Sequence, residues 1–296
     1  MQTLISLFPE VIKSSNYRFN LTGLISSLVV LYCISLAVFV WSRNKKLVGF
    51  SFFTIAFPVA MWNLTIAMGN FASNINVTYF YYRLTYFFVF LIPPASLFIS
   101  LTLTNMITVR KEKIFLIISY IIMFLISFLS LLTDKIMKYP PLRYSWGMDG
   151  HAGDWLFYLL VPWAGLALKA TYNMYITYRR TSSILEKNKY RILLLGYFIG
   201  YLAAEDYLGE LGIPVYPFGY LTTCILMTLV VYCIVRYKVF EFETVIHRTI
   251  MWILASAAVF APLILVVYLT RSLFTKLPSF TLSLFYMLFF LLFQAY

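Results

Sequence analysis

Residues 201–218 read YLAAEDYLGELGIPVYPF and place two adjacent carboxylates, Glu205 and Asp206, near the end of an apolar run. A membrane helix that carries neighbouring carboxylates must pair them or raise them into water, because an uncompensated charge is costly in lipid. One glycine and two prolines within residues 212–217 then predict a turn. The apolar run restarts at Tyr220, so the stretch predicts two membrane helices joined by a tight turn beside two acids.

The composition of the whole chain requires a membrane. Of its 296 residues, 62% are hydrophobic, 20% aromatic and only 11% charged, which is too apolar for one soluble core. The net charge is +12, and the basic residues lie in short clusters between the apolar runs. This distribution is typical of the loops of a membrane protein and excludes a basic stripe that binds nucleic acid. The three cysteines, Cys33, Cys224 and Cys233, lie inside apolar segments, so they predict buried side chains and neither disulfides nor a metal site.

The spacing of the apolar runs predicts an all-α polytopic helix bundle. A bilayer core needs about 20 apolar residues per helix. Residues 1–20 lack the basic start of a signal peptide and predict an amphipathic helix on the membrane surface. A seven-helix domain over 21–248 follows, and 249–296 holds two more helices. We expect nine spans, at 21–42, 47–70, 79–106, 114–132, 155–178, 191–209, 217–235, 249–270 and 280–296.

Lysine and arginine predict the orientation. Alternate connections differ roughly two to one in basic residues, which places the N-terminus outside and the C-terminus in the cytoplasm. The last span ends at Tyr296 without a basic flank, so we expect the sequence to continue in a longer protein.

A polar cluster is predicted near the outer ends of the spans. Arg83 lies at the same depth as Glu205 and Asp206, and pairing with a carboxylate is the expected state of an arginine in a span. Two interpretations remain open: an outward-facing ligand cavity, or a structural ion pair at the level of the headgroups. The candidate ligand-binding residues are Arg83, Glu205, Asp206, Trp62, Asn63, Tyr82 and Tyr216.

Other polar features give weaker signals. Pro93 and Pro94 predict a break in the third span. The connection 134–154 either caps a pocket or is a solvated loop. His151 and His247 lie on opposite sides of the membrane in this topology, so no metal site is expected. The chain also lacks nucleophile, phosphate-binding and nucleotide-binding motifs, so we expect it to be non-catalytic and without a cofactor.

Several motifs together resemble the N-terminal seven-helix sensor region of bacterial histidine kinases. The strongest is the Gly-Ile-Pro-x-Tyr-Pro-x-Gly turn at residues 212–219, followed by the Cys-Ile-Val-Arg-Tyr exit at 233–237. The others are Ser-Trp-Gly at 145–147, Ala-Gly at 152–153, and the basic link from Tyr178 to Arg191. The resemblance covers about residues 21–248.

The resemblance implies the input module of a two-component sensor in the bacterial cytoplasmic membrane. Its implied partners are an external or lipid-like signal, membrane lipids, a second copy of the chain and, through a cytoplasmic region absent here, a response regulator. The phospho-accepting histidine and ATP-binding boxes of a kinase are absent from this sequence, while a full-length protein would be a histidine protein kinase. The alternative is a small-solute transporter, for which broken helices and intramembrane charges are also expected. The sequence does not identify the signal.

Overall fold

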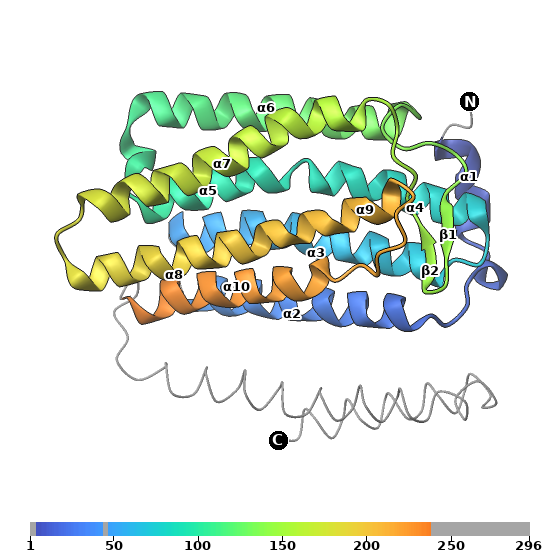
Figure 1. Ribbon diagram of the computed structural model, residues 1–296, viewed down its shortest axis with the longest axis horizontal. Helices are drawn as coiled ribbons and strands as arrows, with labels where there is room; N and C mark the ends of the chain where they lie inside the picture. The colour runs from blue at the N-terminus through green and yellow to red at the C-terminus, as the bar shows by residue number, and fades with distance from the viewer. Residues whose placement is uncertain (1–3, 44–46, 238–296) are drawn as a thin grey trace, which may run out of the picture. The chain divides into compact units, whose positions relative to one another are not determined.

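A computed structural model describes residues 4–43 and 47–237 of the chain. Figure 1 shows the long helices of this part lying side by side as a bundle, with a small hairpin at the end where α1 lies. The elements are α1 (Leu4–Val11), α2 (Leu21–Arg43), α3 (Leu47–Phe71), α4 (Ile75–Val89), α5 (Ile92–Leu103), α6 (Arg110–Leu132), β1 (Leu142–Tyr144), β2 (Gly147–Asp149), α7 (Leu156–Arg180), α8 (Ile184–Tyr201), η3 (Leu202–Glu205), α9 (Asp206–Glu210) and α10 (Gly219–Arg236), with short 3-10 turns η1 (Ser14–Asn16) and η2 (Met106–Thr108).

The predicted all-α membrane bundle is confirmed for this part of the chain. Within the described residues, 6 helical segments are long and apolar enough to cross a bilayer. The other long helix, α7, has 25 residues and coincides with the span predicted at 155–178. Each of the first seven predicted spans therefore contains a long helical segment. The spans predicted at 249–270 and 280–296 lie outside the described residues.

The third span is interrupted where its sequence predicts a break. Helix α4 ends at Val89 and α5 begins at Ile92, just before Pro93 and Pro94. A proline at position 93 has no N–H to donate to the carbonyl of Val89 four residues earlier. The indole Nε1 of Trp163 on α7 donates to that carbonyl instead, at 3.1 Å. The break is thus stabilised by a side chain from another helix.

The helix predicted over residues 1–20 is shorter in the structure: α1 covers only Leu4–Val11, and it packs onto the bundle through buried Leu7. Lys13 and Glu10 form an ion pair at 2.7 Å, and the Tyr17 and Tyr81 hydroxyls lie 3.0 Å apart. The contact between Tyr17 and Tyr81 ties the N-terminal segment to α4. Its location on a membrane surface stays a prediction.

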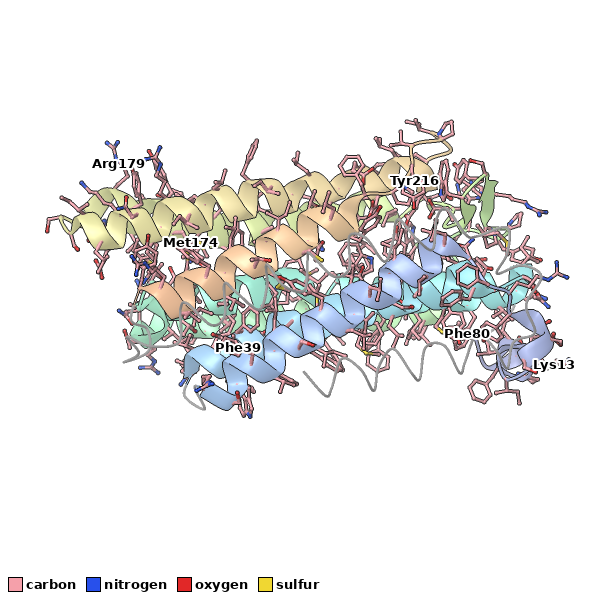
Figure 2. All side chains as sticks on the ribbon, turned by 90° about the horizontal axis from the view of Figure 1, so that it is seen from below. Lys13, Phe39, Phe80, Met174, Arg179 and Tyr216 are labelled. Atoms are coloured by element: carbon pink, nitrogen blue, oxygen red, sulfur yellow. The ribbon has the colours of Figure 1, made fainter. Side chains whose placement is uncertain are left out.

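The connection between α6 and α7 is folded over one end of the bundle, which we call the hairpin end. Strands β1 and β2 pair antiparallel, with Leu142 opposite Asp149. The Ala152 N–H donates to the Glu210 carbonyl at 2.9 Å, and the Tyr144 hydroxyl donates to the Gly209 carbonyl at 2.6 Å. Of the two expectations for this connection, a pocket cap and a solvated loop, the structure therefore favours the cap. Figure 2 shows Tyr216 toward the hairpin end and Arg179 at the opposite end.

Candidate functional site

A cavity of about 300 Å³ lies inside the bundle and extends to the hairpin end. This volume is at the lower end of the range for ligand pockets. Its wall is built from α3, α4, α5, α7, α8, η3, α9, α10 and the hairpin, and most of its area is apolar. The aromatic residues of the wall are Trp62, Tyr82, Tyr86, Trp146, Trp163, Tyr197, Tyr201 and Tyr207.

Three carboxyl groups line the cavity, those of Asp149 on β2 and of Asp206 and Glu210 on α9. Each has a fixed hydrogen-bond partner. The Gly150 N–H donates to Asp149 Oδ1 at 2.7 Å, the Gly219 N–H donates to Asp206 Oδ1 at 3.0 Å, and the Tyr86 hydroxyl donates to Glu210 Oε2. Main-chain amides and a buried phenol hold the three acids in place. The acids still border the open space of the cavity.

Two glycines allow this close seating of the acids. A Cβ added at Gly209 would collide with Asp149 Oδ2, and one added at Gly219 would collide with Asp206 Oδ2. Both positions therefore require a residue without a side chain. The glycines belong to the same acidic stretch and turn, residues 201–219, that stand out in the sequence.

Glu205 and Asp206 have a structural role that their sequence context does not reveal. Glu205 Oε1 accepts from the Phe218 N–H at 2.6 Å, and Asp206 Oδ1 accepts from the Gly219 N–H. Both carboxylates thus cap the N-terminus of α10, where free N–H groups and the helix dipole favour negative charge. Only Asp206 also lines the cavity.

The predicted pairing of Arg83 with these acids is wrong. Arg83 is 1% exposed and donates to three carbonyls at the C-terminal end of α6, those of Ser130 (3.1 Å), Leu131 (2.7 Å) and Thr133 (3.0 Å). No ion pair joins it to Glu205 or Asp206 within residues 4–43 and 47–237. A guanidinium satisfies the free carbonyls and the negative end of the helix dipole there.

The other candidate residues divide between cavity wall and packing. Trp62 and Tyr82 line the cavity. Asn63 does not: it is buried, and its Nδ2 donates to the Val59 carbonyl of its own helix at 3.0 Å. Tyr216 also lies outside the wall, where its ring meets Trp146 edge-on at 5.7 Å. The structure thus brings Trp62, Tyr82 and Asp206 together and leaves out Arg83, Glu205, Asn63 and Tyr216.

Sequence reasoning missed Asp149, Glu210 and Trp163. Glu210 lies four residues after Asp206, so helical spacing places both acids on one face and carries a usable signal. Asp149 lies in the connection between α6 and α7, whose sequence has no periodic pattern, so its position over the bundle could not be predicted. The role of Trp163 has only an indirect signal in the sequence. Pro93 leaves the Val89 carbonyl without its helical N–H donor, so a donor from another helix is expected.

Lys169 is not part of the cavity wall and forms an ion pair with Glu112 at 2.9 Å. Glu112 lies in the first turn of α6, where a negative charge is favourable. The pair joins α7 to α6. It gives Lys169 a packing role among the described residues.

Burial raises the pKa of the Asp149 carboxyl from 3.8 to about 6. The hydrogen bonds from Gly150 and Tyr82 oppose this shift, and the charge of Glu205 adds to it. The folded bundle therefore binds more protons than the unfolded chain between these two values. Its stability should fall as the pH rises through this window.

Asp149→Asn is expected to remove this loss, so the variant should unfold a few degrees above the wild type at neutral pH and lose that advantage near pH 3.8. Thermal unfolding followed by tryptophan fluorescence in detergent measures the difference. Asp154→Asn is the matched control, because the hydrogen bond from Lys138 lowers the pKa of Asp154, which reverses the expected sign. If the unfolding temperatures of Asp149→Asn and the wild type changed with pH in the same way, a raised pKa of Asp149 would be contradicted.

Fold and cavity together define a polytopic helical membrane protein with a ligand-sized internal site. Residues 25–243 match the family model described as the N-terminal 7TM region of histidine kinase. The chain therefore belongs to this family, as its motifs predict, and the described part holds the long helix α7 beside the 6 candidate spans that composition identifies. A comparison with curated proteins found no match.

Proposed function

We propose that this chain is the signal-input module of a two-component sensor histidine kinase, and that its signal binds in the central cavity. The observation that carries the proposal is a cavity with a fixed acidic end inside a bundle of this family. Its wall includes residues of α10, the helix that leads toward the C-terminal part of the chain. A bound molecule can thus contact both the acidic stretch and the helix that would transmit a change.

The proposal includes the orientation and assembly expected from the sequence. The hairpin end would face outward and the basic ends of α7 and α10 the cytoplasm, in the bacterial cytoplasmic membrane. Two further helices over 249–296 would connect the bundle to kinase domains encoded beyond Tyr296, acting as a homodimer on a response regulator. The chain itself would need no cofactor. A ligand would act only through different affinities for two helix arrangements.

The test uses the full-length gene product in lipid nanodiscs supplied with radiolabelled ATP. We expect acid-labile, alkali-stable phosphate on the protein, as phosphohistidine requires. Absence of this label, together with solute uptake by the same protein in liposomes, would contradict the proposal and favour the transporter.

A further inference from the structure

We propose that the cavity takes an amphipathic organic cation, an amine or ammonium group on an apolar chain, with its charged group beside Asp149, Asp206 and Glu210. This names the class of signal for the site described above and so rests on the proposed function. Charge, aromatic content and the form of the opening each support it.

The charge of the wall has one sign. Three carboxylic acids line the cavity, and its lining among the described residues includes no lysine, arginine or histidine. Asp149 and Glu210 are 7% and 8% exposed, and their partners are an amide and a phenol, which carry no positive charge. Buried carboxylates are strongly stabilised by a cation. A ligand that brings a positive charge therefore fits this wall, whose acids have no cationic partner among the described residues.

The aromatic rings of the wall favour the same ligand. Trp62, Trp146 and Trp163 come from three different elements and share the cavity with the acids. The faces of aromatic rings, of tryptophan above all, attract organic cations. Carboxylates alone would suit a metal ion equally well. However, no group of three potential metal ligands among the residues described here has the geometry to hold one.

The position of the cavity's opening favours a ligand with an apolar chain. Ala164 and Leu168 on α7 and Ala204 on η3 belong to the wall and are also exposed on the outside of the bundle. The cavity thus reaches the surface between α7 and η3, on the side of a membrane bundle. Beyond the acids the wall is mainly aliphatic, with Ile55, Val59 and Ile92. A chain dissolved in the bilayer can enter here, since its transfer keeps apolar surface out of water.

Decylamine is the test probe, applied in radiolabelled form to the full-length protein in phosphatidylcholine nanodiscs. We expect saturable binding for which decyltrimethylammonium competes, while 1-decanol and decanoate at equal concentration do not. This selectivity needs no variant and no assumption about folding. Equal competition by decanol or decanoate, or an absence of saturable binding, would overturn the proposal.

A matched pair of variants then locates the charged group. Asp206→Asn and Glu205→Gln each remove one negative charge and weaken one hydrogen bond that caps α10, but only Asp206 lines the cavity. We expect Asp206→Asn to weaken decylamine binding about tenfold or more, the effect of losing one charge-assisted hydrogen bond. Glu205→Gln should change it less than about threefold. Equal effects of the two variants would overturn the placement of the cation.

Different experimental results would rule out the ligand class and the proposed function. If decylamine does not bind but filling the cavity still changes histidine phosphorylation, the ligand class is wrong and the sensor stands. If decylamine binds with the expected selectivity and no phosphohistidine forms, the binding site stands and the kinase function falls.

Discussion

Arg83→Ala should destabilise the bundle by about 3 kcal/mol or more, since each hydrogen bond from a charged group contributes roughly 1.5–3 kcal/mol. The side chain is buried and holds three carbonyls at the end of α6. Its loss leaves a cavity and leaves those carbonyls without their donor. Thermal and denaturant unfolding of the purified protein in detergent measures the change.

Arg143→Ala is the control for this prediction, because Arg143 is exposed on β1. It should unfold within about 0.5 kcal/mol of the wild type. Arg83→Lys should fall between, as an ammonium reaches fewer carbonyls than the guanidinium fork. An Arg83→Ala protein as stable as Arg143→Ala would show that the α6 contacts contribute little.

Gly153→Ala should have a comparable effect by a different cause. A Cβ at this position would collide with the backbone of Lys135. That backbone cannot easily move, because Gly153 N–H donates to Ile136 O at 2.8 Å and Trp155 N–H donates to Lys135 O at 2.9 Å. Overpacking against fixed backbone costs about 1–3 kcal/mol or more. We expect a loss of about 3 kcal/mol and a loosened entry into α7.

Gly165→Ala is the matched control, since it makes the same change twelve residues later, in α7. A Cβ at Gly165 meets nothing within 4 Å. Alanine is favoured over glycine in a helix by about 1 kcal/mol, so this variant should be slightly more stable. The two glycine variants should thus change stability in opposite directions. A Gly153→Ala protein as stable as Gly165→Ala would refute the close approach at Gly153.

The sequence predicts most of the fold because a membrane imposes simple rules on it. Long apolar runs, basic connections and proline breaks identify the helices, and α4 and α5 separate just before Pro93 and Pro94. The hairpin was outside these rules. Its strands have three residues each, which is too short for an alternating pattern to register.

The site was predicted in part, and the error at Arg83 has a geometric reason. Depth along a helix follows from residue number, so Arg83 and Asp206 were correctly expected near one end of the bundle. Direction around the helix does not follow from depth. At 3.6 residues per turn, Tyr82 and Tyr86 share a face that reaches the cavity, whereas Arg83 is rotated by about 100° from Tyr82 and meets α6.

The acidic pair shows the same limit. Adjacent residues on a helical segment point in different directions, so Glu205 and Asp206 cannot both face one cavity in the same way. The structure uses both to cap α10 and only Asp206 to line the wall. Glu210, one helical turn further, is the second acid that α9 contributes to that wall.

The central claim, that the cavity controls kinase output, is tested most directly by filling it. Ala167 on α7 lines the cavity and is 5% exposed, whereas Val161 on the same helix is 71% exposed and lies outside the wall. In the full-length protein in nanodiscs, Ala167→Phe should change the rate of histidine autophosphorylation at least about fivefold, the lower range of allosteric coupling. Val161→Phe should leave that rate unchanged. A folded Ala167→Phe protein that phosphorylates at the wild-type rate would contradict the account.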